Sequence, residues 1–312
     1  MVSLIQEFVT GNCPMTNTVE VNETTNIAAG NAQRWKRLRR LPISLYIGGT
    51  LVSTFVLVSF ISFIWTPYPA NSLNLQNRLS PPGTPGFFLG TDRAGRDVTT
   101  ELMLGARNSL YVSVVSTIVA MLVGATIGLA IAGSKRSLQG PLTRLVDVGI
   151  ALPGILTALV LAAKFGPGNT TATLAIITWQ IPIAARVTIG PARQILALDY
   201  VEAAYSYGRK KSYVLKRHVL PNISPLLIVL SSVMFAAAIL IEAALAFLSV
   251  GVQPPTSSWG RFLNETQSLL EAAPYLMFFP GISIVLTALG FNLLGDGLRT
   301  VLDPQQARSG LA

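Results

Sequence analysis

Six long apolar runs constrain this chain more than any other feature of its sequence. An α-helix needs about 20 residues, at roughly 1.5 Å each, to cross the hydrocarbon core of a bilayer. The runs are Ile43–Trp65, Leu110–Gly133, Leu142–Phe165, Thr171–Ile189, Asn222–Val250 and Leu276–Leu294. Only 12% of the 312 residues are charged, whereas soluble domains carry about a quarter. We therefore expect an all-α polytopic membrane protein with six transmembrane helices.

Basic residues lie unevenly around these runs. If the N-terminus lies in the cytoplasm, 17 of the 23 Lys and Arg residues fall on the inner side. The positive-inside rule selects this topology, so we expect a multi-pass protein of the cytoplasmic (inner) membrane with both termini cytoplasmic. A net charge of +9 would suggest nucleic acid in a soluble protein. Here the charges border apolar runs, so membrane lipid is the expected partner and nucleic acid is not.

The runs also divide the chain into parts with different composition. The N-terminal part is rich in Asn and Thr, which is typical of disorder, and the sequence leaves open whether Met1 or Met15 is the true start. The predicted parts are a disordered cytoplasmic tail (1–33), a basic anchor with the first transmembrane helix (34–65), an extracytoplasmic loop (66–108), a five-helix core (109–302) and a cytoplasmic tail (303–312).

The residue types needed for enzyme chemistry are scarce. Cys13 is the single cysteine and His218 the single histidine, so neither an internal disulfide nor a metal site is expected. The glycine spacing from Gly128 to Gly133 lacks the Gly-Lys-Ser/Thr ending of a phosphate-binding loop. A hydrolase triad lacks its histidine base, since His218 stands alone on a basic loop. We therefore expect no catalytic residues, no cofactor in this chain and no enzyme activity of its own.

A few charged residues fall within or beside the apolar runs. Glu242 lies well inside its run, where an ionisable group is costly and is a candidate for a role in transport. The alternative is a structural role near the outer end of the helix. Asp147 and Asp296 lie near inner helix ends, where we expect them to pair with Arg144 and Arg299.

The expected extracytoplasmic segments contain a polar cluster and a tryptophan. The cluster consists of Asp92, Arg93, Arg96 and Asp97, and it serves either to dock a binding protein or to rigidify the outer loop. Asp97 is also a plausible N-cap, because its carboxylate can accept a free backbone N–H. Trp259 precedes a short helical pattern and is expected to anchor it at the outer interface.

The stretch "YVEAAYSYGRKKSYVLKRHVLPN", from Tyr200 to Asn222, is polar and basic between two apolar runs. Its pattern predicts a short helix, in which Leu198, Val201 and Tyr205 share a face and Gly208 ends the helix. A second helical piece, Ser212–Val219, then leads to Pro221 in the first turn of the next membrane helix. These two short helical pieces and the turn between them, called the bracket below, are suited to enter a groove on a soluble partner. The alternative is an interfacial loop that binds anionic lipid headgroups through Arg209, Lys210 and Lys211.

The same stretch carries a family resemblance. Glu202-Ala203-Ala204, three residues, Gly208, nine residues and "HVLP" resemble the EAA loop of binding-protein-dependent ABC importer permeases. The stretches "LGTDRAGRDVTTELMLGARNSL", "EAALAFLSVGVQPPTSSWG" and "GFNLLGDGLRTVLDP" resemble the C-type permease of the dipeptide, oligopeptide and nickel importers, the DppC/OppC type. The chain departs from the pattern at Arg209-Lys210-Lys211, where the family has small residues, and in "FLSVG".

The resemblance implies a methionine-importer-like ABC permease fold and an assembly of several subunits. This chain would pair as a heterodimer with a homologous B-type permease, beside two ATP-binding subunits that carry ATP and magnesium, and would receive substrate from an extracytoplasmic binding protein. Its coupling loop would span about 193–221, and the substrate would be a di- or oligopeptide, a glutathione-like compound or nickel. The residues implied to contact the ATPase are Val201, Glu202, Ala203, Ala204, Tyr205 and Gly208.

Two other function classes fit the sequence less well. A self-contained secondary transporter or channel would need ion-coupling groups within the membrane, often at broken helices, and only Pro182 and Glu242 come near this. A membrane enzyme would need a nucleophile and a base, for which no constellation is present in the sequence.

Overall fold

The computed structural model describes residues 42–302. The tails predicted at 1–33 and 303–312 and the basic cluster at 34–41 lie outside these residues. Within them the chain is helical between its loops, and the only β pairing is two isolated bridges, Thr84 to Phe87 and Thr91 to Asp97.

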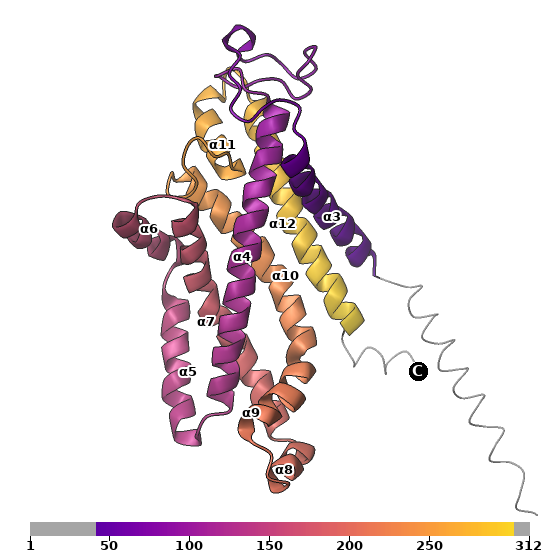
Figure 1. Cartoon of the computed structure of the whole chain (residues 1–312), viewed down its shortest axis with the longest axis vertical. Coiled ribbons are helices and arrows are strands. Elements are labelled where there is room, and N and C mark those ends of the chain that lie inside the picture. Colours follow the sequence, from indigo (N-terminus) through magenta and orange to yellow (C-terminus); the bar gives the residue numbers. More distant parts are fainter. Residues whose placement is uncertain (1–41, 303–312) are drawn as a thin grey trace, which may run out of the picture. The chain divides into compact units, whose positions relative to one another are not determined.

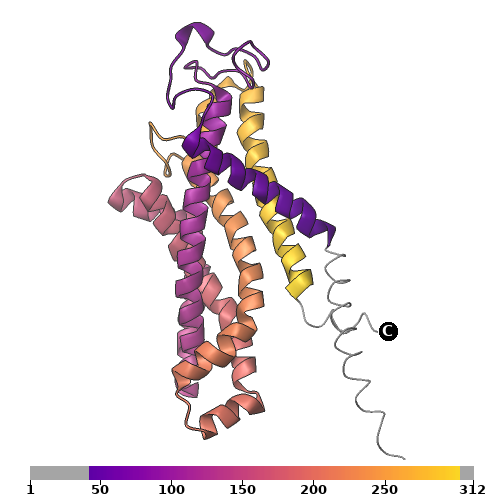
Figure 2. The same cartoon turned by 45° about the vertical axis from the view of Figure 1, so that its right-hand side comes forward.

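Five helical segments of the described chain are long and apolar enough to cross a membrane. They are α3 (Ile43–Ile64), α4 (Val98–Ala132), α7 (Asn169–Leu196), α10 (Leu220–Phe247) with the preceding α9 (Lys211–Val214) and π-helical turn η2 (Leu215–Val219), and α12 (Tyr275–Leu302). In Figures 1 and 2, α3 and α10 run towards the end of the bundle that carries α11 (Trp259–Thr266), whereas α4, α7 and α12 run the opposite way.

A bent pair of helices supplies the sixth crossing. Helices α5 (Arg136–Ala151) and α6 (Gly154–Phe165) meet at 78°. The bend follows from Pro153, which has no backbone N–H to continue the helix and disfavours helical geometry at Leu152. The apolar run predicted over Leu142–Phe165 therefore forms two helices joined by a bend and not one continuous helix.

Hydrogen bonds show that the bent pair joins the two ends of the bundle. At its start, the side-chain amide of Gln139 donates to the carbonyl of Ala132, the last residue of α4, at 3.1 Å. Just after its end, the Gly168 N–H donates to the Val250 carbonyl beyond α10 at 3.3 Å. The chain thus traverses the bundle between these points, and the predicted six-helix architecture stands with one helix broken.

Helix α4 begins at Val98, twelve residues before the apolar run that starts at Leu110. The Asp97 carboxylate accepts from the Thr100 N–H at 2.8 Å, so the predicted N-cap is confirmed. The loop predicted over 66–108 therefore ends at Asp97, because its last residues form the polar first turns of α4, which hydropathy alone does not indicate. At 1.5 Å per residue the 35 residues extend about 52 Å, well beyond the roughly 30 Å of hydrocarbon.

Helices α4 and α7 pack through small residues. A Cβ at Gly128 would lie 2.6 Å from the Ala185 carbonyl oxygen and 2.6 Å from the Thr188 Cβ, closer than real contacts allow. Gly124 meets Ala184 in the same way one turn earlier. Without a hydrophobic driving force between helices in lipid, close backbone approach and dispersion hold such pairs together.

Trp259 lies in the core and not at the membrane interface, so the predicted anchor is wrong. It begins α11 (Trp259–Thr266), and only 4% of its surface is exposed. Its ring centroid is 5.5 Å from that of Phe55 in α3, and its Nε1–H donates to the Leu102 carbonyl at 2.9 Å. The indole therefore joins α11 to α3 and α4.

The described chain between α3 and α4 folds on itself at the end of the bundle that carries α11, which is called the outer end after the topology expected from the sequence (Figure 1). It contains a short 3₁₀ turn, η1 (Leu75–Asn77), and a second such turn, η3 (Gln267–Leu269), follows α11. The rings of Tyr68 and Phe87 stack with centroids 5.0 Å apart. The Tyr68 hydroxyl donates to the Gly86 carbonyl at 2.7 Å, which closes the loop.

Candidate functional site

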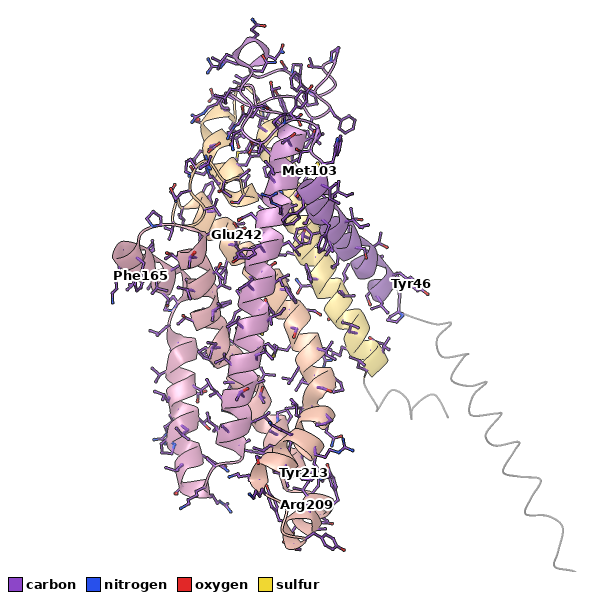
Figure 3. The ribbon with its side chains drawn as sticks, viewed as in Figure 1. Tyr46, Met103, Phe165, Arg209, Tyr213 and Glu242 are labelled. Atoms are coloured by element: carbon purple, nitrogen blue, oxygen red, sulfur yellow. The ribbon has the colours of Figure 1, made fainter. Side chains whose placement is uncertain are left out.

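The predicted helical bracket forms at the opposite end of the bundle. Helix α8 (Asp199–Ser206) follows α7 after two residues. Gly208 takes φ +72°, a conformation that is costly for residues with a Cβ, and its N–H donates to the Tyr205 carbonyl at 2.8 Å. The second helical piece then runs through α9 and η2 into α10 without a break, with Pro221 in the first turn of α10. Figure 3 shows Arg209 and Tyr213 here, far from Met103 at the outer end.

Val201 fastens this bracket to the bundle. Its side chain is fully buried and packs in a cluster with Ala132 of α4, Ala192 of α7, Val214 of α9 and Val219 of η2. Val201 thus differs from the other predicted coupling residues, because its side chain faces inward. A displacement of α8 must therefore be transmitted to the inner ends of these helices, since close-packed interiors resist local compression.

The remaining predicted coupling residues are accessible on α8. Glu202, Ala203 and Tyr205 are exposed, Ala204 is half-buried against the Val201 cluster, and Gly208 is exposed at the turn. Partial burial raises the pKa of the Tyr205 hydroxyl. The outward face is thus small at Ala203 and acidic at Glu202, and another protein surface can approach the backbone closely there.

His218 is held by aromatic rings. The Tyr200 and Tyr213 rings lie edge-on to it with centroid distances of 6.0 Å and 5.9 Å. The Asn222 side-chain amide donates to the His218 carbonyl at 2.8 Å and to the Tyr200 hydroxyl at 3.1 Å. These contacts tie α8 to the start of α10 and give the single histidine a packing role.

Cations border an open hollow of about 650 Å³ beside Gly208. The lining is strongly basic and includes no acidic residue. It consists of Gly208, Arg209, Lys210, Ser212, Tyr213, Lys216 and Arg217. The Arg209 guanidinium lies 5.0 Å from the Tyr213 ring centroid, a cation–π distance. This surface suits an acidic partner or anionic headgroups.

Arg96 is the centre of the polar cluster at the outer end. Its Nε lies 2.6 Å from Asp92 Oδ2, its Nη2 2.5 Å from Glu265 Oε2 in α11, and its Nη1 3.8 Å from Glu101 Oε1. Burial alone would lower the pKa of Arg96, but Glu101, Asp92 and Glu265 outweigh it and raise that pKa. Glu265 also pairs with Arg261 on its own helix. The cluster therefore ties the outer loop to α11.

The four candidate outer residues divide into two groups. Asp92 Oδ1 accepts the backbone N–H groups of Ala94 and Arg96 at 2.7 Å and 2.9 Å, and Asp97 caps α4. Asp92, Arg96 and Asp97 thus hold the loop in shape. The Arg93 side chain is exposed, and its carbonyl accepts from Arg78 Nε at 2.6 Å. Arg93 alone of the four has a side chain displayed for a docking partner.

Glu242 lies inside the packed bundle near the outer end of α10 (Figure 3). Its side chain is 1% exposed, and Oε2 accepts from the Ser109 hydroxyl of α4 at 2.9 Å. Oε1 has no hydrogen-bond partner within residues 42–302. This position favours a structural link between α10 and α4 over a path-lining role.

The pairs expected for Asp147 and Asp296 do not form in the described chain. Asp147 Oδ1 lies 3.2 Å from Arg186 Nε on α7, not against Arg144, because the adjacent helix offers a cation on the facing side. Asp296 makes no ion pair with any described residue. Arg186 is a candidate that the sequence reasoning missed. The available signal was a charged residue within the apolar run Thr171–Ile189.

The family comparison accords with this architecture. The family model described as "Binding-protein-dependent transport system inner membrane component" matches residues 102–308. The chain belongs to this family. It is accordingly a multi-pass permease subunit of an ABC importer in the inner membrane, and a component of a transport system, not an enzyme.

Curated relatives match almost the full length of the chain. The chain is 35% identical over 271 residues to the glutathione transport system permease protein GsiD of Pectobacterium atrosepticum, covering 87% of this chain and 90% of that protein. It is 34% identical over 273 residues to the dipeptide permease DppC of Alkalihalophilus pseudofirmus, covering 88% and 89%. It is 37% identical over 266 residues to the di/tripeptide permease DppC of Pseudomonas aeruginosa, covering 83% and 88%.

A solved structure shares the fold at low identity. The chain superposes on an inward-facing structure of the MetNI methionine ABC transporter with a TM-score of 0.55 at 14% identity, covering 65% of this chain and 96% of that one. The predicted methionine-importer-like fold is thereby confirmed.

Proposed function

We propose that this permease forms half of the translocation path of a peptide importer, beside a homologous B-type permease. The relatives named above transport dipeptides, di/tripeptides and glutathione, which is itself a tripeptide. Small peptides are the chemical class that these substrates share, so we assign that class to this chain and place nickel second.

The observation that supports this proposal is the arrangement of exposed and buried residues in the bracket around Gly208. Glu202, Ala203 and Tyr205 form its exposed face, and Val201 on the same short helix packs against the ends of α4, α7 and η2. We assign this face to a groove on one of two ATP-binding subunits, which carry ATP and magnesium. A force on α8 then tilts membrane helices, provided that the contact energy differs between the two states.

The same assignment sets the orientation. The bracket faces the cytoplasm, where the ATPases lie, and the basic residues around Gly208 follow the positive-inside rule. Both chain termini are then cytoplasmic. The outer loop and α11 face the extracytoplasmic binding protein, and the exposed Arg93 is the side chain that we assign to that contact.

Co-expression with the candidate partners tests the proposal. We expect the chain to co-purify with a second permease and two ATPases, and the reconstituted complex to import di- or tripeptides only with ATP and a loaded binding protein. Glu202→Lys should abolish uptake without preventing insertion, because it places a cation on the contact face. Glu271→Lys, the same change at an exposed outer position, is the matched control. Peptide uptake by the isolated chain would overturn the proposal.

A further inference from the structure

One side of α7 carries exposed polar residues beside two sparsely packed and mostly apolar helices, α5 and α6. Helices α5 and α6 each bury a single residue, Val146 and Ala158, which makes them the least enclosed long helices of the described chain. Beside α5, α7 carries Thr178, Arg186, Gly190 and Gln194 on its exposed side. These residues recur every four or eight positions, so they form one row that winds around the helix by about 40° for every four residues; this row is called the stripe below.

The stripe contains an exposed ion pair. The Arg186 and Asp147 side chains are 49% and 46% exposed, and Arg186 Nε lies 3.2 Å from Asp147 Oδ1. The topology expected from the sequence assigns Arg186 to the inner side, but the residue lies within the apolar run Thr171–Ile189, ten residues and about 15 Å before the end of α7 at Leu196. Half-exposed charges at this depth are too costly against acyl chains, so the face meets water or protein.

The pair leaves most of the guanidinium free. Arg186 approaches Asp147 through Nε, and its two terminal amino groups make no hydrogen bond within residues 42–302. By contrast, the neighbouring Arg193 donates from Nη2 to the Thr143 hydroxyl at 3.1 Å and is half-buried. An added Cβ at Gly190, next to Arg186 on the stripe, would meet nothing within 4 Å. The terminal amino groups of Arg186 are therefore without a partner among the described residues, on a side chain that is 49% exposed.

We propose that this stripe lines the translocation path and that Arg186 binds the carboxylate of the substrate in transit. A guanidinium presents two parallel N–H donors that match a carboxylate, and every linear peptide carries a terminal carboxylate. Asp147 holds Arg186 in place and offsets its charge when no substrate is bound, which keeps the binding weak enough for release. The assignment rests on the proposed function, because peptides supply the carboxylate.

Thiol labelling tests the exposure of the stripe. Since Cys13 is the single cysteine, a Cys13→Ser background allows single-cysteine variants. In the assembled importer we expect Thr178→Cys and Gly190→Cys to react with a membrane-impermeant anionic methanethiosulfonate in at least one nucleotide state. Val285→Cys on α12, where the native side chain is apolar and 61% exposed, should not react in either state. Failure of both stripe positions to react would mean that protein covers the face and would overturn the inference.

Uptake of matched peptides tests the role of Arg186. We compare a tripeptide with its C-terminal amide, each normalised to loading of the binding protein. Arg186→Gln should lower uptake of the free acid about tenfold and leave the amide within about twofold, as expected for loss of one charge-assisted contact. Arg299→Gln, which removes an exposed cation on α12, should change neither.

The outcomes distinguish carboxylate binding by Arg186 from peptide import by the complex. Equal loss of acid and amide uptake in Arg186→Gln, or no preference for the acid in the wild-type importer, would overturn carboxylate binding while peptide import stands. Uptake of neither peptide by the wild-type importer would overturn the proposed function, and this inference with it.

Discussion

Arg96 and Glu265 are 169 positions apart, and Arg96 Nη2 lies 2.5 Å from Glu265 Oε2. This contact links the loop before α4 to α11. Because Arg96 also reaches Asp92 and Glu101, a single guanidinium organises carboxylates from three segments. Such a fixed outer surface can receive a docking protein without a change in its structure. Ordering a loop on binding would cost free energy and weaken the complex.

The first prediction concerns the acid stability of this link. Burial alone would raise the pKa of Glu265, but its hydrogen bond to Arg96 and the charges of Arg96 and Arg261 hold that pKa below its usual value. The folded state then binds fewer protons than the unfolded state, so the contribution of Glu265 to stability is complete above its unfolded pKa of about 4.3 and is lost as pH falls through the lower folded pKa. The melting temperature of the complex should therefore fall as the pH is lowered below about 5.

Two variants check the origin of this acid sensitivity. Glu265→Gln removes the titrating group, so its melting temperature should be lower at pH 7 and depend less on pH between about 3 and 5. Glu271→Gln, at an exposed position, should retain the wild-type profile. Parallel pH profiles for Glu265→Gln and the wild type would show that the acid sensitivity has another source.

The second prediction separates the two outer arginines. Arg96→Met leaves the buried carboxylates of Asp92 and Glu101 without their cation, which should destabilise the fold by roughly 3 kcal/mol and expose the outer loop to protease. Arg93→Met changes an exposed side chain and should leave the melting temperature within about a degree. Protease resistance of Arg96→Met at the wild-type level would contradict the structural role of the cluster.

The third prediction uses the backbone of Gly208. At φ +72° a β-branched residue is strained by about 1–2 kcal/mol or more, whereas Asn tolerates this conformation. Gly208→Val and Gly208→Pro should therefore deform the coupling turn and reduce ATP-dependent uptake at least about fivefold with normal membrane insertion. Gly208→Asn should keep more than about half of it. Because an added Cβ meets nothing within 4 Å, equal loss in all three variants would point to contact with a partner instead of strain.

The fourth prediction tests the α4–α7 packing. Gly128→Val forces the two helices apart, because the new Cβ would lie 2.6 Å from the Ala185 carbonyl oxygen, and overpacking of this kind costs about 1–3 kcal/mol. Gly281→Val is the matched control on α12, where an added Cβ meets nothing within 4 Å. The melting temperature of the detergent-solubilised complex should fall for Gly128→Val alone. A similar fall for both would indicate a general effect of the substitution.

Local signals in the sequence predicted local structure well. The apolar runs identified every membrane helix, Asp97 identified the start of α4, and Gly208 identified the end of α8. Each of these features depends on residues within a few positions, so periodicity and capping chemistry suffice.

Features that depend on distant residues were missed or misplaced. Trp259 is apolar enough for an interface, and only the fold shows that Phe55 and Leu102 enclose it. Asp147 was paired with Arg144 on its own helix, whereas the partner is Arg186 on α7. The polar cluster around Arg96 likewise depends on Glu265, which lies on a helix remote in sequence. Pairings between helices follow from tertiary packing, for which one sequence carries no direct signal.

The fifth prediction decides whether Glu242 is structural or couples ions. Its carboxylate is buried between α10 and α4 and accepts from Ser109 at 2.9 Å, so a neutral isostere that keeps an acceptor should suffice. Glu242→Gln should retain uptake within about twofold, whereas Glu242→Leu removes the acceptor, leaves the Ser109 hydroxyl unpaired and should lower the melting temperature. Ser109→Ala combined with Glu242→Leu should recover part of that loss, because both partners are then apolar. A stable Glu242→Gln importer without uptake would instead favour a proton- or ion-coupled carrier, since charge and not packing would then be the property that transport requires.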